Sequence, residues 1–233
     1  MKKIRQKQSY FSPFEAALWG GSVLLILMAF IAFDRTNCLS LAASLVGVTS
    51  LIFSAKAHPL GQLLMVVFSL LYGIVSYTFA YYGEMLTYLG MTAPMSVFSL
   101  ISWLRHPYRG DRAEVQVGTV SRKAKAGIAA AALPVTVLFY FILKYFHTAN
   151  LLPSTLSVTT SFLAVCLTAC RTPYFALAYA ANDVVLIVLW TLAGFSDPRY
   201  VSVTVCFVAF LVNDLYGFFH WRSIRQRQTK ASA

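Results

Sequence analysis

The feature of this sequence that most restricts its fold is a series of eight long apolar segments with few charged residues inside them. A helix needs about 20 residues to cross the hydrocarbon core of a bilayer, and each segment is close to that length. Lipid cannot hydrogen-bond to the backbone, so such segments cross it as helices. The predicted spans run approximately over residues 14–33, 38–54, 60–82, 84–104, 127–146, 149–170, 175–194 and 199–221.

Composition predicts an all-α polytopic membrane protein that occupies the whole chain as a single membrane domain. Of the 233 residues, 58% are hydrophobic and only 12% are charged, whereas soluble domains carry about 25% charged residues. The four cysteines lie in apolar segments and form no CxxC motif. We therefore expect them to be small buried residues, with no disulfide, metal site or cofactor.

The distribution of Lys and Arg predicts the orientation in the membrane, because cytoplasmic loops are enriched in both. If the N-terminus is cytoplasmic, only Arg35, Lys144 and Arg199 of the 19 basic residues lie outside. We therefore predict a multi-pass protein of the cell membrane with both termini in the cytoplasm. The loop 105–126 and the tail 222–233 would then face anionic lipid, so the net charge of +11 does not indicate nucleic acid as a partner.

The two halves of the chain show a weak internal repeat. Sliding the sequence by 118 positions places Trp103 over Trp221 and Tyr72 over Trp190. Trp103 and Trp221 each precede basic residues, and we expect them at the inner membrane interface. Parallel repeats occur in transporters, with the site between them near the midplane. The predicted parts are an N-terminal helix (14–33), a first three-helix repeat (38–104), a linker helix (127–146) and a second three-helix repeat (149–221).

Two Asn-Asp pairs interrupt otherwise apolar spans, at Asn182-Asp183 and at Asn213-Asp214. A charged Asp at the centre of a span costs ~2.5–3.5 kcal/mol on insertion scales. Such residues usually face the interior of a bundle or a water-filled cavity and mark a pathway. The alternative is a structural carboxyl that is protonated or hydrogen-bonded by its neighbours.

Aromatic residues share helix faces with these polar groups. Tyr179, Asp183 and Trp190 lie on one side of the seventh span, and Tyr88 and Met95 belong to a similar stripe on the fourth. An aromatic ring beside a carboxylate at mid-depth suits a flat, cationic ligand. Packing between helices explains the same stripes, so the spacing alone does not decide.

Several motifs carry a family resemblance. GEMLTYLGMTAPMSVFSLISW at 83–103 and FLVNDLYGFFHWR at 210–222 resemble the "YGE…lP…W" and "N-x-x-Y-G-(aromatic)-x-x-W" segments of the PnuC family of bacterial vitamin-precursor transporters. FSAKAHPLG at 53–61 and the NDVVLIVLW stretch after Arg171 resemble two further segments of that family. The resemblance covers most of residues 40–225.

The resemblance implies a three-plus-one-plus-three helix arrangement similar to SWEET transporters, assembled as a homotrimer. It implies import of nicotinamide riboside, a precursor of NAD, by facilitated diffusion, with a cytoplasmic kinase that traps the substrate. Asn213 and Trp190 match the family pattern. Asp183 stands where the family has Asn, Tyr179 where it has Trp, and Ser96 where many relatives carry Gln. Thiamine and riboflavin, which relatives carry, therefore remain alternatives.

The chemistry of nicotinamide riboside fits the candidate residues. Its pyridinium ring is flat and permanently positive, and aromatic faces attract cations by ~0.5–2 kcal/mol. Its hydroxyl and carboxamide groups need hydrogen-bonding partners such as Asn and Asp. Thiamine is also a flat cation. The predicted substrate-binding residues are Asn182, Asp183, Asn213, Asp214, Trp190, Tyr179, Tyr72, Tyr88, Met95 and Ser96.

Three other functions remain open at this stage. One is proton-coupled uptake, with Asp183 or Asp214 as the proton carrier. Another is an intramembrane enzyme, but the chain has no HExxH, GxSxG or paired-aspartate motif, and its four histidines lie at predicted span ends. The last is a membrane scaffold without a ligand, which need not place carboxyl groups inside the bilayer.

The orientation leads to a direct test. A reporter that is active only in the cytoplasm, fused after Lys230, is expected to be active. Activity there of a reporter that works only outside the cytoplasm would contradict the predicted topology.

Overall fold

The computed structural model describes residues 10–148 and 150–231, and among these it has eight helices long and apolar enough to cross a membrane. The predicted all-α polytopic fold is therefore confirmed. The helices are α1 (Pro13–Phe33), α2 (Cys38–Ala55), α3 (Leu60–Thr78), α4 (Tyr82–Thr87) continued by the π-helical turn η1 (Tyr88–Thr92) and α5 (Ala93–Arg105), α6 (Arg122–Tyr145), α7 (Leu151–Ala169), α8 (Tyr174–Gly194) and α9 (Tyr200–Lys230).

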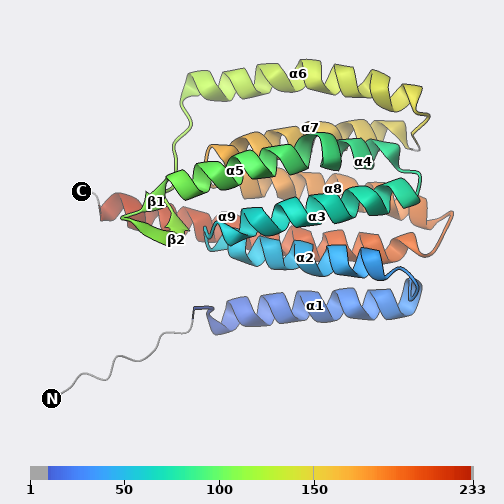
Figure 1. Cartoon of the computed structure of the whole chain (residues 1–233), viewed down its shortest axis with the longest axis horizontal. Coiled ribbons are helices and arrows are strands. Elements are labelled where there is room, and N and C mark those ends of the chain that lie inside the picture. Colours follow the sequence, from blue (N-terminus) through green and yellow to red (C-terminus); the bar gives the residue numbers. More distant parts are fainter. Residues whose placement is uncertain (1–9, 149, 232–233) are drawn as a thin grey trace.

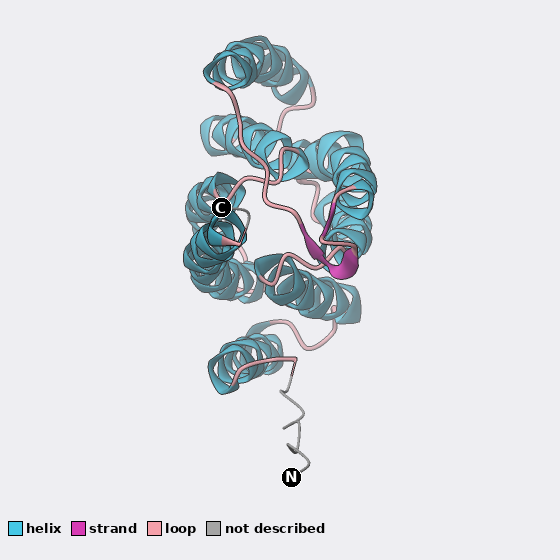
Figure 2. Cartoon of the chain, turned by 90° about the vertical axis from the view of Figure 1, so that its left-hand side faces the viewer, coloured by secondary structure: helices cyan, strands magenta, loops and turns pink. Residues whose placement is uncertain are grey.

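Six of the spans form a closed ring around a common centre. Neighbouring helices pack in the order α2, α3, α5, α7, α8 and α9, and α9 packs back onto α2. Helix α1 lies outside the ring against α2 and α9, and α6 lies outside it against α7 (Figures 1 and 2). The ring thus consists of two three-helix units, α2–α5 and α7–α9.

The connection between α5 and α6 differs most from the sequence prediction. It contains a short hairpin of β1 (Pro107–Tyr108) and β2 (Asp111–Val115), which lies at one end of the ring, toward its edge (Figure 2). We call this the hairpin end, and the end with the α3–α4 and α8–α9 connections the far end. The linker helix begins at Arg122 rather than at 127, and α9 continues to Lys230 where a tail was expected from 222.

The two units have matching turns at the hairpin end. Ala57, after α2, and Arg171, after α7, both have φ of 55°. Their N–H groups donate to the carbonyls of Ser54 and Thr168, each at 2.9 Å. The α5–α6 connection hydrogen-bonds to both turns in the same way. Val115 N donates to Ala57 O (2.9 Å), and Gly118 N donates to Arg171 O (2.8 Å). The α5–α6 connection therefore binds the same turn in both units.

The turns correct the register of the internal repeat. Ala57 and Arg171 are 114 positions apart, four fewer than the spacing that relates Trp103 to Trp221. The start of α3 and the start of α4 are 22 positions apart, whereas the starts of α8 and α9 are 26 apart. The second unit is therefore four residues longer at the far end, about one helical turn. The predicted pairing of Tyr72 with Trp190 is wrong by this amount.

Trp103 and Trp221 are not interfacial residues as expected, because both side chains are fully buried. Trp103 Nε1 donates to the carbonyl of Thr168 at the end of α7 (3.1 Å), and Trp221 Nε1 donates to that of Ser54 at the end of α2 (2.7 Å). Each unit thus ends in a tryptophan that bonds to the first helix of the other unit. The indole rings meet with their centroids 5.3 Å apart.

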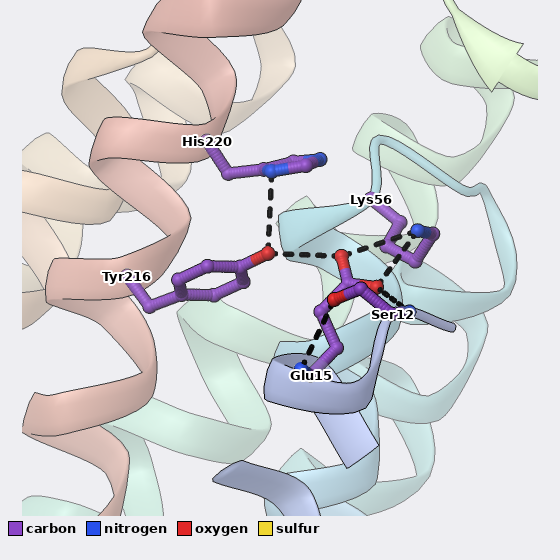
Figure 3. Close-up of polar contacts among 5 residues, drawn as sticks. All are labelled: Ser12, Glu15, Lys56, Tyr216 and His220. Atoms are coloured by element: carbon purple, nitrogen blue, oxygen red, sulfur yellow. Dashed lines mark hydrogen bonds and ion pairs between the residues drawn. The ribbon is translucent and has the colours of Figure 1, made fainter. Parts of the chain in front are cut away.

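A buried ion pair attaches α1 to the ring (Figure 3). Glu15, whose side chain is 2% exposed, lies 3.0 Å from Lys56 Nζ, on the α2–α3 connection. Tyr216 of α9 donates its hydroxyl to the same carboxylate (2.9 Å), and His220 Nδ1 lies 3.2 Å from that hydroxyl. Ser12 and Glu15 also form a capping box at the start of α1. One carboxylate therefore joins α1, α2 and α9.

The buried ion pair predicts that replacing Lys56 lowers the free energy of unfolding more than replacing Arg227 does. Replacing Lys56 with Met leaves the Glu15 carboxylate buried without its cation, so we expect unfolding to become easier by about 3 kcal/mol. Replacing Arg227, whose exposed side chain pairs with Glu114, should cost ~0–1 kcal/mol. Denaturant titration of the purified variants measures both. Equal effects would show that Glu15 does not depend on Lys56.

Candidate substrate site

The ring encloses a small central cavity at mid-depth. Its wall comes from α2, α3, η1, α7, α8 and α9, so both three-helix units contribute. The cavity measures about 20 Å³, enough for a single water, whereas ligand pockets are usually ~300–1,000 Å³. This conformation is therefore closed around its site. The lining residues are Leu51, Met65, Phe68, Tyr88, Thr92, Ser161, Tyr179, Asn182, Asp183, Phe207, Phe210 and Asp214.

Two carboxyl groups face each other in this cavity. Asp183 lies on α8 and Asp214 on α9, both nearly inaccessible to solvent, and their side chains are in direct electrostatic contact. Oδ2 of Asp183 has no hydrogen-bond partner among the described residues. Two ionised carboxylates repel each other strongly where water is excluded. Such a pair therefore holds either a proton or a positively charged ligand.

The wall carries no cation to balance this pair, since none of its residues is Lys, Arg or His. Asn182 is oriented by α7, because its Oδ1 accepts hydrogen bonds from Thr160 (2.7 Å) and Ser161 (3.1 Å). Tyr88 and Tyr179 contribute rings beside the carboxyl groups. The cavity thus combines two carboxyl groups, aromatic faces and an amide.

Five of the ten sequence-predicted residues meet in the cavity wall, namely Asn182, Asp183, Asp214, Tyr88 and Tyr179. Tyr72 and Trp190 are buried one layer behind it, where Trp190 Nε1 donates to the Tyr72 hydroxyl (2.7 Å). Tyr72 then packs on Tyr88, with the ring centroids 4.4 Å apart. These two residues support the wall in this conformation.

The remaining three lie elsewhere. The Asn213 amide donates to Ser22 of α1 (2.9 Å) and to the carbonyl of Ala209 (2.8 Å), so it points toward the peripheral helix. Ser96 is buried on α5, and Met95 beside it is half-buried; neither lines the cavity. An Asn-Asp pair places its two side chains about 100° apart on a helix, which explains why Asn213 and Asp214 diverge.

Aromatic layers close both ends of the site. At the hairpin end, Trp103, Phe175 and Trp221 are in mutual ring contact, and fully buried Val115 of β2 packs against this cluster. At the far end, Phe79, Tyr81, Trp190 and Tyr200 form a second cluster. Burial raises the pKa of Tyr81, which keeps its phenol neutral.

The side chain of Gln228 holds the hairpin over the aromatic layer at the hairpin end. Its Oε1 accepts from Val117 N (2.8 Å), and its Nε2 donates to the carbonyl of Val115 (3.1 Å) and to Glu114 Oε1 (2.8 Å). The closure at this end thus depends on the extension of α9 beyond its membrane-spanning part.

Sequence reasoning did not select Glu84 as a site residue. This residue is fully buried on α4, and its Oε2 accepts a 3.3 Å hydrogen bond from Ser157 of α7. A signal was present, because an acidic residue close to the end of a predicted span is unusual in an apolar environment. In the sequence, Glu84 stands within the 83–103 segment that carries the family resemblance.

Two three-helix units around a polar cavity at mid-depth define a membrane transporter. Residues 37–223 match the family described as "Nicotinamide mononucleotide transporter", and because the match covers most of the chain, the protein belongs to this family. It is a transporter and not an enzyme.

Two comparisons agree with this assignment. The "Nicotinamide riboside transporter PnuC" of Neisseria mucosa is 24% identical over 217 residues, which cover 91% of this chain and 82% of the relative. A solved structure described as "Crystal structure of the Vitamin B3 transporter PnuC" has the same fold, with a TM-score of 0.81 at 23% identity over 94% of each chain.

Proposed function

We propose that this protein carries nicotinamide riboside across the cell membrane. The observation that supports this most is the acidic central cavity, in which Asp183 and Asp214 lie beside aromatic rings without a cation to balance them. A flat pyridinium ring supplies the missing positive charge and stacks on tyrosine faces. Its ribose hydroxyls and carboxamide find partners in Asn182 and the carboxyl groups.

The same cavity favours the riboside over the phosphorylated mononucleotide after which the family model is named. A phosphate group needs Arg, Lys or a helix N-terminus to bind it. The wall offers no basic side chain and contains two carboxyl groups. We therefore propose that the mononucleotide is excluded by charge repulsion and by the cost of desolvating the phosphate.

Transport would proceed by alternate opening of the two aromatic layers. The site is closed at both ends and contracted to about 20 Å³, so binding requires the units to separate at one end. We propose facilitated diffusion, in which the substrate moves down its gradient and a cytoplasmic kinase traps it by phosphorylation. The charged product would no longer fit the acidic site.

A second candidate is proton-coupled uptake, which the contact between Asp183 and Asp214 favours. A proton held by this pair would leave when a cationic substrate arrives, and the two movements would be linked. Accumulation of substrate against its gradient, driven by a pH difference across proteoliposomes, supports this candidate. Simple equilibration supports facilitated diffusion.

We place the hairpin end in the cytoplasm, because the basic residues gather there. Both termini then lie inside, and the far end faces the exterior. We also propose a homotrimer in the bilayer, with α1 and α6 available for lateral contacts. Both helices lie outside the ring and expose large apolar side chains such as Leu24, Met28, Leu133 and Phe141.

Binding to purified protein tests the substrate and the site together. We expect isothermal titration to detect nicotinamide riboside and to detect the mononucleotide at least tenfold more weakly, since an uncompensated charge in a buried site costs more than ~1.4 kcal/mol. Asp183→Asn keeps the shape of the site but removes charge. It should weaken binding of the riboside and of thiamine about tenfold and change that of neutral riboflavin least.

The exposed acid Asp111 provides the control. Asp111→Asn removes the same charge far from the cavity and should leave every dissociation constant unchanged. Two results would contradict the proposal. One is equal affinity for riboside and mononucleotide in the parent protein, and the other is unchanged riboside affinity in a folded Asp183→Asn variant.

A further inference from the structure

Glu84 is a third buried carboxyl group inside the ring, outside the cavity wall. Its side chain has no exposed surface, and its two oxygens are unequally satisfied. Oε2 accepts a long hydrogen bond from Ser157 (3.3 Å), whereas Oε1 has no partner within the described part of the chain. An ionisable group at such a depth costs several kcal/mol unless it is paired.

No ion pair of the residues that the structure describes includes Glu84. The ion pairs of the described residues involve Lys56, Arg199 and Arg227, and each of them pairs with another acid. Packing leaves little room for a different arrangement of α4. A Cβ added at Gly83 would lie 2.9 Å from Leu143 and 3.0 Å from Thr148, so the backbone that carries Glu84 is held close to its neighbours.

The position of Glu84 connects the far end with the cavity. It is two residues from the start of α4, and Tyr88 follows one turn deeper and lines the cavity. Tyr88 is within electrostatic range of both Glu84 and Asp183. The helix then widens into the π-helical turn η1, a feature often found at functional sites. From the far end to the cavity, the inner face of the ring therefore carries an acid, an aromatic ring and a second acid, namely Glu84, Tyr88 and Asp183.

We propose that Glu84 is an additional binding position for the cationic ring, which the substrate occupies between the far end and the central cavity. This inference rests on the proposed transport of a cationic riboside. The unpaired oxygen provides the counter-charge, and Tyr88 provides an aromatic face shared by both positions. The ring moves from Glu84 to Asp183 without losing a carboxylate partner.

Two isosteric substrates test this role. Nicotinamide riboside is a cation, and its 1,4-dihydro form has nearly the same shape but no charge on the ring. Initial uptake rates of both are measured in proteoliposomes that contain Glu84→Gln, which keeps the side-chain shape and an acceptor for Ser157. We expect uptake of the cation to fall about tenfold and that of the neutral form to change less than about twofold, the effect of one lost charge-assisted contact.

Equilibrium binding separates this position from the central site. Glu84→Gln should change the affinity for the cation in the cavity by less than about threefold, because the final contacts of the ring with Asp183 remain. Glu84→Asp, which retains the charge, should keep the cation-to-neutral uptake ratio near that of the parent. Asp197→Asn, at a partly exposed acid of the far end paired with Arg199, is the matched control and should also keep this ratio.

Each other outcome contradicts the inference. Unchanged uptake of both forms by Glu84→Gln means that this acid is a protonated structural group. Equal loss for both forms means that it maintains the closure or the fold, which the thermal unfolding midpoint distinguishes. If Glu84→Gln does not fold, the folded Glu84→Asp variant provides the test. A cation-to-neutral uptake ratio that differs from that of the parent protein then contradicts the inference. Failure of the parent protein to bind the riboside would instead contradict the proposed function.

Discussion

The closed ring depends on a reciprocal hydrogen bond between its two three-helix units. The last helix of each unit carries a buried tryptophan, Trp103 or Trp221, that donates to a carbonyl at the end of the other unit's first helix. Lipid offers no donor to a carbonyl at a helix end. The carbonyls of Ser54 and Thr168 each accept the N–H of the following turn, and the indole of the other unit adds a second hydrogen bond to each while it closes the ring. The α5–α6 connection then binds the same turn in both units.

The polar groups inside the ring are best understood against the cost of placing them there. Asp183, Asp214 and Glu84 are all buried, and the ion pairs of the described residues include none of them. Glu15, by contrast, has Lys56 and Tyr216 as partners and attaches a peripheral helix. The Glu15 carboxylate is fully hydrogen-bonded, whereas Asp183 and Glu84 each have one oxygen without a partner among the described residues. This difference supports a structural role for Glu15 and the proposed binding role for the acids inside the ring.

Sequence patterns were sufficient to predict the membrane-spanning segments, because the bilayer requires each of them to have a certain length and low polarity. They also located the carboxyl groups, since charge in an apolar segment is conspicuous. They did not predict which side chain faces the centre. Neighbours such as Asn213 and Asp214 differ by about 100° in direction, and only the packing of α1 and α9 shows that the first faces α1 and the second faces the cavity.

The register of the internal repeat and the layers that close the site could not be predicted, because both depend on contacts between residues far apart in the sequence. A four-residue difference at the far end shifts Trp190 by about one turn relative to an ungapped alignment, and no local signal marks its place. The short β1–β2 hairpin is stabilised by Gln228, over 110 residues away in sequence. The sequence marks Glu84 as an acid near a span end, but only the packing of α4 against α7 shows that Ser157 bonds one carboxylate oxygen and that the other has no partner among the described residues.

A structure of the protein in lipid nanodiscs with saturating nicotinamide riboside is the most direct test of the acidic cavity as the substrate site. A substrate site in this cavity predicts density for a flat ring between the Asp183–Asp214 pair and the tyrosines Tyr88 and Tyr179, in a cavity larger than about 20 Å³. It also predicts that one of the two aromatic layers is open or displaced. Ring density elsewhere, with the central cavity unchanged at about 20 Å³, would contradict it.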